Sequence, residues 1–219
     1  MRSKTLSLMM ALVALGVLLA SCSQQRITSY DTGVAQLAAI QNKYGVDFQQ
    51  SPPGADSIAS LSAETVALKR KVVENDDMKP LLLLFDYRIN TLDADRLLIE
   101  GFQWGAASTT EPGFGCKKGS ERILNSSRLR NESANAGLAA AESLRQFVNG
   151  YPEKAAALNL TQRTILSLTT TYAVVQKQAE KDHRIIMGFC VEHAAEVVVD
   201  GETITNRPGE DGQAGQQSS

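Results

Sequence analysis

One stretch decides the fold: residues 79–104 read KPLLLLFDYRINTLDADRLLIEGFQW. Leu81 opens a run of five apolar residues, and further apolar residues recur along one side as far as Trp104. This pattern is typical of an α-helix that buries one face. Pro80 fits the first turn of such a helix, because its missing N–H costs little there. We therefore predict one long helix over about residues 79–107.

The same reasoning predicts further helices along the chain. Apolar residues at three- and four-residue spacing indicate helices over about 56–74, 120–149 and 162–189. The helix at 120–149 has a possible interruption near residues 125–127. A shorter helix is expected over 31–44, with Asp31 as its N-cap.

The remaining segments are turns, linkers or ambiguous. Residues 49–54, QQSPPG, and 109–119, TTEPGFGCKKG, are rich in glycine and proline and predict a linker and a loop. Residues 191–205 fit either a hairpin, because Asp-Gly suits a two-residue turn, or a fraying helix end. Residues 206–219 are Gly, Gln, Ser and acidic residues, which predicts a disordered tail.

The composition favours a helical fold and argues against a nucleic-acid partner. The chain has 219 residues, of which 43% are hydrophobic but only 5% aromatic. Leu, Ile, Val and Ala must therefore build the core, which favours helix packing over a β-sandwich. The formal net charge is −2 and no long basic block occurs, so we expect no nucleic-acid partner. The predicted fold class is all-α, an antiparallel helical bundle with long helices.

The first residues have the features of an export signal. Arg2 and Lys4 precede an apolar run over 6–20 that is interrupted only by Ser7 and Gly16. Such a run is short for a membrane-spanning helix, which needs about 20 residues. A basic start, a short apolar segment and small residues at its end are typical of a secretory signal peptide.

The end of this run is more specific. Leu19-Ala20-Ser21-Cys22 resembles the lipobox of prokaryotic lipoproteins. The resemblance implies cleavage before Cys22 and a diacylglyceryl group on its sulfur, and Ser23 is compatible with the outer membrane where two membranes exist. A lipid anchor is also needed physically, because the cleaved chain has a formal charge of −4 and would not adhere to anionic lipid. The alternatives are an ordinary cleaved signal with a chance cysteine, or a retained anchor.

These features divide the chain. We predict a lipoprotein signal peptide over 1–21, a lipidated N-terminus with a short helix and linker over 22–54, a helical bundle over 55–200 and a mostly disordered tail over 201–219. Within the N-terminal part, residues 23–29 are polar and are expected to form a tether from the lipid.

Two further cysteines suggest one disulfide. Outside the cytoplasm an even pair, here Cys116 and Cys190, favours a bridge. Each flanks one of the helices predicted over 120–149 and 162–189, and the turn between these helices centres on Tyr151-Pro152. An antiparallel pair would bring both cysteines to one end and close a helical hairpin. Two free thiols are the alternative.

A second resemblance is local. Residues 141–158, AESLRQFVNGYPEKAAAL, resemble the second helix and turn of tetratricopeptide-type repeats in envelope assembly lipoproteins, through Phe147 and Tyr151-Pro152. No second copy lies 34 residues away on either side, so a solenoid is not predicted.

No pattern of catalytic residues emerges. His183 and His193 lack the spacing of a zinc site, and His183 is expected on a solvated helix face. No nucleophile elbow or phosphate loop occurs, so we expect neither an enzyme nor a cofactor or metal. Asn125, Asn131 and Asn159 begin Asn-x-Ser/Thr sites, and the sequence leaves their modification open.

One basic patch could bind a partner, whether an acidic protein or a lipid headgroup. It consists of Lys117, Lys118, Arg122, Arg128 and Arg130. A plain solvated helix face is the alternative. The leading hypothesis for function is a membrane-anchored extracytoplasmic lipoprotein with a structural or protein-interaction role in the cell envelope. The rival is a lipoprotein that binds a small ligand in a pocket between its helices.

Overall fold

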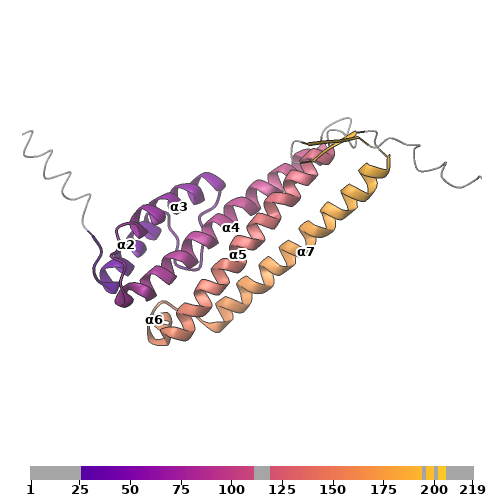
Figure 1. Cartoon of the computed structure of the whole chain (residues 1–219). Coiled ribbons are helices and arrows are strands. Elements are labelled where there is room, and N and C mark those ends of the chain that lie inside the picture. Colours follow the sequence, from indigo (N-terminus) through magenta and orange to yellow (C-terminus); the bar gives the residue numbers. More distant parts are fainter. Residues whose placement is uncertain (1–25, 111–118, 194–195, 200–201, 206–219) are drawn as a thin grey trace, which may run out of the picture.

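The protein is a bundle built on three long helices. The computed structural model describes residues 26–110, 119–193, 196–199 and 202–205. The long helices α4 (Lys79–Thr110), α5 (Gly119–Gly150) and α7 (Gln162–His193) have 32 residues each and are about 48 Å long. They lie side by side with α5 between α4 and α7, and successive helices run in opposite directions (Figure 1). The predicted all-α bundle is therefore confirmed.

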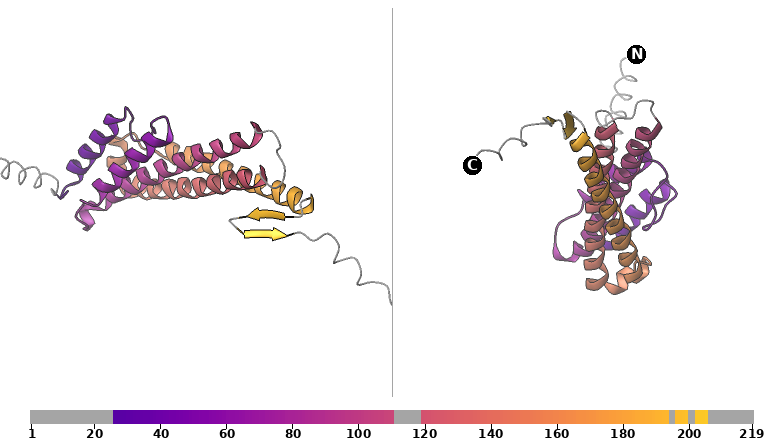
Figure 2. Two further views of the ribbon diagram at one scale, coloured as in Figure 1. Left: turned by 90° about the horizontal axis from the view of Figure 1, so that it is seen from above. Right: turned by 90° about the vertical axis from the view of Figure 1, so that its right-hand side faces the viewer.

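Shorter elements cover one side and both ends. The helices α2 (Tyr30–Lys43) and α3 (Ala55–Lys69) pack on α4, and the 3-10 turn η1 (Asp76–Met78) leads into it. A short helix, α6 (Pro152–Ala157), joins α5 to α7. The strands β1 (Glu196–Val199) and β2 (Glu202–Thr205) pair antiparallel, and β1 packs on α5 and α7 (Figure 2).

These strands settle the ambiguous stretch. The helix continues through His193 and a hairpin follows it, with Val199 paired to Glu202. The second strand includes Thr203, Ile204 and Thr205, which the sequence analysis assigned to the tail. These three residues are β-branched and favour extended backbone.

Several predicted features lie outside the described residues. They are the signal peptide, Cys22, Cys116, Lys117, Lys118 and residues 206–219, together with the side chain of Cys190. The pairing of the two helices that the cysteines flank is confirmed, because α5 and α7 pack against each other. No disulfide occurs within the described part of the chain, and the Cys116–Cys190 bridge stays a prediction.

The segment over 23–29, which was expected to be a tether, is attached to the bundle through Ile27 near its C-terminal end. Ile27 is buried and forms a parallel β-bridge with Val72. Its N–H donates to the carbonyl of Lys71 at 2.8 Å, and its own carbonyl accepts from the N–H of Val73 at 3.0 Å. Ile27 is the one apolar residue in this polar stretch, and its side chain is buried in the core. The cap of α2 also differs from the prediction, since Ser29 rather than Asp31 accepts from the N–H of Thr32.

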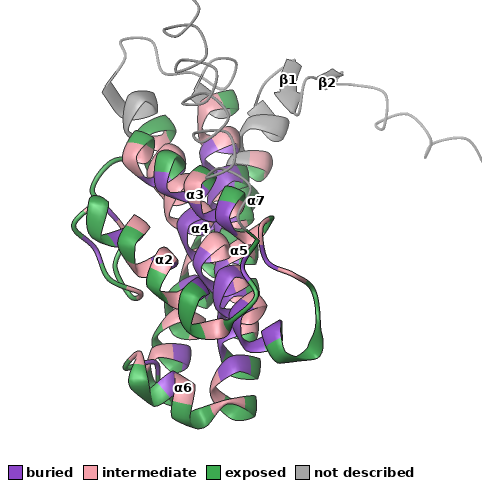
Figure 3. Cartoon of the chain, turned by 90° about the vertical axis from the view of Figure 1, so that its left-hand side faces the viewer, coloured by how far each residue is buried: buried purple, intermediate pink, exposed green. Residues whose placement is uncertain are grey.

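The main core lies between α4 and α5 and beneath α2. Figure 3 shows the buried residues concentrated where these helices face each other. The largest fully buried apolar side chains include Phe85, Phe147, Leu81, Leu84 and Leu37. Aliphatic and small residues fill most of the remainder, as the low aromatic content predicted.

Serines fasten α5 to both of its neighbours. Ser126 and Ser133 donate to carbonyls of α4, at Gly101 and Ala94, over 2.6 and 2.7 Å. On the other side, Ser127 donates to the carbonyl of Ala179 in α7 over 2.6 Å. The possible interruption near residues 125–127 does not occur, because Ser126 and Ser127 bond to adjacent helices and α5 continues unbroken.

Candidate functional site

A polar cluster lies buried where α2, α3 and their connection meet α4. Arg88 has no exposed surface. Its guanidinium donates to the carbonyl oxygens of Phe48 at 3.2 Å and Gln50 at 2.8 Å. The Tyr87 hydroxyl donates to the same Phe48 oxygen at 2.9 Å, and burial raises the pKa of Tyr87 to about 12. The segment expected to be a linker is thus held tightly against α4.

Asp95 extends this cluster to α7. Its two carboxylate oxygens accept from the Ser51 hydroxyl at 2.6 Å and the Tyr172 hydroxyl at 2.7 Å. Burial, followed by the charge of Asp95, raises the pKa of Tyr172 well above its ordinary value. Each of these hydrogen bonds joins two different elements. The cluster is best understood as a structural fastening of the bundle rather than as a reactive site.

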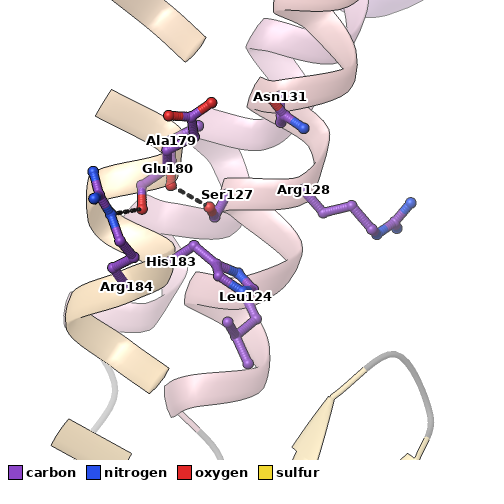
Figure 4. Close-up of a pocket in the computed structure, with 8 residues that line it drawn as sticks. All are labelled: Leu124, Ser127, Arg128, Asn131, Ala179, Glu180, His183 and Arg184. Carbon is purple, nitrogen blue, oxygen red and sulfur yellow. Dashed lines mark hydrogen bonds between the residues drawn. The ribbon is translucent and has the colours of Figure 1, made fainter. Parts of the chain in front are cut away.

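An open hollow lies between α5 and α7. It has a volume of about 450 Å³. Figure 4 shows His183 between the two helices, with Leu124 close below it. We call this hollow the α5–α7 groove. Its lining residues are Leu124, Ser127, Arg128, Asn131, Ala179, Glu180, His183 and Arg184.

The lining residues follow helical spacing on both walls. Positions 124, 127, 128 and 131 share one face of α5, and positions 179, 180, 183 and 184 share one face of α7. The small residues Ser127 and Ala179 touch through their hydrogen bond and form the bottom of the groove. Because both are small, the larger side chains around them leave space.

One lining group has no hydrogen-bond partner. The side-chain oxygen of Asn131 is buried and receives no hydrogen bond from the described residues. Leaving a buried acceptor unpaired costs about 1–3 kcal/mol. Asn131 was noticed in the sequence only as a modification motif. The signal that could have singled it out is a polar residue on the face of α5 that carries Leu124.

A second hollow lies at the opposite end of α5. It has a volume of about 380 Å³ and is lined by Lys79, Leu83, Glu142, Arg145, Gln146, Asn149, Gly150 and Tyr151. Arg145 and Glu142 pair with each other across one helical turn. No buried unpaired polar group lies among its lining residues.

Of the predicted basic patch, Lys117 and Lys118 lie outside the described residues, and the three arginines do not share one exposed surface. Arg128 is exposed and pairs with Glu132 at 2.8 Å, and Arg122 is half-buried. Arg130 is only 8% exposed, pairs with Asp182 at 2.8 Å and lies against the Phe102 ring. Residues 128 and 130 are about 200° apart around a helix, so neighbours in sequence face opposite ways. Arg130 is therefore corrected from a surface residue to an interior ion pair.

Comparisons with known proteins do not extend this description. We find no match to the chain among protein-family models, curated proteins or solved structures. Function must therefore be argued from the residues themselves.

Two features of the described residues bear on the kind of site. No helix in this part of the chain is long and apolar enough to span a membrane. Over the same residues, no group of three or more His, Cys, Asp and Glu side chains gathers to hold a metal ion.

Proposed function

We propose that this protein is a lipid-anchored extracytoplasmic lipoprotein of the cell envelope, with a structural or protein-interaction role. The lipobox residues Leu19-Ala20-Ser21-Cys22 support the anchor. The proposed site is the outer membrane facing the periplasm where two membranes exist. The proposal includes no catalytic activity, no cofactor and no nucleic-acid partner.

The observation that carries the proposal is the docking of Ile27 at one end of the bundle. Ile27 belongs to the same buried core cluster as Leu81, Phe147 and Ala155. Four residues lie between Cys22 and Ile27, so five Cα–Cα steps join them and span at most about 18 Å when fully extended. A lipid on Cys22 would therefore hold this end of the bundle near the membrane. We call it the anchor end.

The long helices then project the rest of the molecule away from the membrane. Arg128 in the α5–α7 groove precedes Gly150, the last residue of α5, by 22 residues, which corresponds to roughly 33 Å along the helix. This arrangement suits a rigid spacer that presents its far end to an envelope protein. The proposed Cys116–Cys190 bridge would lie at that far end, because α5 begins there at Gly119 and α7 ends there at His193 (Figure 1).

The anchor is tested by replacing Cys22. We expect Cys22→Ser to move the protein from the membrane fraction to the soluble fraction, or to leave it uncleaved. The reason is that stable anchoring takes two lipid signals, and the cleaved variant would carry no lipid on residue 22. Fractionation, intact-mass analysis and crosslinking in whole cells provide the measurement. A crosslinked envelope partner is expected with the native chain and not with Cys22→Ser.

The matched control is Ser23→Ala, which keeps the cysteine and should stay in the membrane fraction. An unmodified Cys22 on a membrane-bound, cleaved chain would contradict the proposal.

The bridge is tested separately. Non-reducing peptide mapping of protein from the envelope is expected to show one peptide pair that joins Cys116 to Cys190. Closing a loop of this length stabilises by roughly 4 kcal/mol in the chain-entropy model, so reduction should lower the melting temperature. Two free thiols would refute the bridge without affecting the anchor.

A second candidate function is favoured by the α5–α7 groove. Its volume of about 450 Å³ lies within the range of small-molecule sites, which is about 300–1,000 Å³. A lipoprotein that binds a small ligand between its helices is therefore the alternative proposal.

A further inference from the structure

The side of α7 that faces away from α5 is open to a partner. Within the described residues α5 packs along α7, β1 contacts α7, and Tyr172 forms one hydrogen bond to α4. Figure 1 shows α7 at the edge of the row of long helices. Three large apolar side chains of α7 are well exposed: Leu166 is 66%, Val174 62% and Ile185 54% exposed. Single exposed apolar residues are ordinary, so their arrangement around the helix decides what they mean.

The three apolar residues share one face of α7 with exposed cations. With 3.6 residues per turn, they lie together with Arg163, Lys177 and Lys181 inside an arc of about 100°. These three cations form no ion pair and no side-chain hydrogen bond within the part of the chain that the structure describes. We call this surface the α7 outer face, which consists of Arg163, Leu166, Val174, Lys177, Lys181 and Ile185.

The acidic residues of the same stretch of α7 point elsewhere. Asp182 pairs with Arg130 of α5 at 2.8 Å, and Glu180 lines the α5–α7 groove. Between residues 163 and 185 no Asp or Glu falls inside the arc. Lys177 and Lys181 are also four residues apart, a spacing at which like charges destabilise a helix. The basic character of the outer face therefore does not serve the stability of α7 itself.

The dimensions of the outer face suit a helix of another protein. Arg163 and Ile185 are 22 residues apart, which corresponds to roughly 33 Å along the helix. An amphipathic helix that lies along α7 can cover the apolar residues with its own apolar stripe. The lysines between them then require acidic residues on the partner, because a complementary charge favours encounter and fixes the register.

Two other occupants are argued against by the same geometry. Under the proposed function, two copies of this chain are anchored at the same end, so their α7 helices would run parallel. A symmetric parallel pair would place Lys177 and Lys181 next to the same residues of the second copy, where like charges repel. A membrane at the anchor end would meet only the beginning of the outer face, because α7 starts at that end and runs away from it.

We propose that the α7 outer face binds an acidic amphipathic helix of another envelope protein. Its apolar residues contact Leu166, Val174 and Ile185, and its carboxylates pair with the cations between them. This inference rests on the protein-interaction role proposed above, and it names the surface that is used and the chemistry of the partner.

Site-specific photocrosslinking in whole cells tests the surface. The photoreactive residue p-benzoylphenylalanine replaces Val174 in the full chain, and mass spectrometry identifies the molecule attached to it. We expect a segment of another protein with Asp or Glu residues at three- and four-residue spacing beside an apolar stripe. The matched control carries the same photoreactive residue in place of Ala67, an exposed position on α3, and should not yield this product.

Charge reversal tests the chemistry of the partner. The double variant Lys177→Glu/Lys181→Glu should lower the yield of the product from position 174 at least about 10-fold, because the acidic partner is then repelled. The control Arg70→Glu/Lys79→Glu makes the same change in net charge at exposed positions outside α7 and should leave the yield unchanged. Thermal melting shows that both variants are folded, as expected for substitutions of exposed side chains.

The outcomes separate this inference from the proposed function. A product that contains lipid, a second copy of this chain or a segment without an excess of carboxylates overturns the proposal, and so does the absence of any product from the folded protein. An undiminished yield after charge reversal overturns the acidic chemistry. A protein crosslinked at position 67 and not at position 174 overturns the outer face and leaves the protein-interaction role standing. The lipid anchor is tested independently by fractionation.

Discussion

Replacing Arg88 by alanine is expected to lower the free energy of unfolding by about 3 kcal/mol. The change removes the donor to the Gln50 carbonyl and one of two donors to the Phe48 carbonyl, which keeps the Tyr87 hydroxyl. A hydrogen bond from a charged group contributes about 1.5–3 kcal/mol. The change also empties the space of a large, fully buried side chain. Relief from burying a guanidinium offsets part of this loss. Denaturant unfolding followed by circular dichroism measures the difference.

A matched control exists on the same helix. Arg96→Ala removes a partly exposed guanidinium that pairs with Glu100 one turn away at 2.8 Å. Such pairs contribute about 0.3–0.5 kcal/mol, so the expected effect is several times smaller than at Arg88. Equal destabilisation by the two substitutions would show that Arg88 does not fasten the connection between α2 and α3.

The Arg88 cluster also shows where prediction from the sequence ends. The long helices could be predicted, because their apolar periodicity is local: 79–107 became Lys79–Thr110 and 162–189 became Gln162–His193. The partners of Arg88 are backbone carbonyls about 40 residues earlier. Any residue carries a carbonyl, so no side-chain pattern identifies positions 48 and 50 as acceptors. The sequence therefore predicted a linker where the structure has a fixed connection.

The candidate groove was missed for a related reason. A hollow arises when small residues on two helices meet at the same level, as Ser127 and Ala179 do. That register depends on how α5 and α7 pack along their whole length, which the spacing within one helix does not specify. Arg130 was wrongly placed in the basic patch for a different reason, because residues 128 and 130 were grouped by their distance in sequence and not by their positions around the helix. The docking of Ile27 was missed because one apolar residue makes no periodic pattern.

The packing register between α5 and α7 depends on Gly137. The Tyr172 ring lies directly over Gly137, in a buried cluster with Ala94 and Ala134. Its hydroxyl reaches across α5 to Asp95 on α4. A Cβ at position 137 would overlap the atoms of this ring. Tyr172 is buried, so the ring has little room to move aside. The absence of a side chain at this position is what allows α7 to bond to α4.

We expect Gly137→Ala to destabilise the protein by about 3 kcal/mol. Overpacking costs about 1–3 kcal/mol, and displacing Tyr172 also removes its bond to a charged acceptor, which contributes about 1.5–3 kcal/mol. Against this stands a gain of about 1 kcal/mol, because alanine favours helix over glycine. Gly188→Ala provides the control on α7, since no atom of the described residues lies within 4 Å of the added carbon. That variant should show the helix gain alone and melt at an equal or higher temperature. If Gly137→Ala also melts no lower than the native protein, Tyr172 does not hold α7 in register, and the contact between α7 and α4 must depend on other residues.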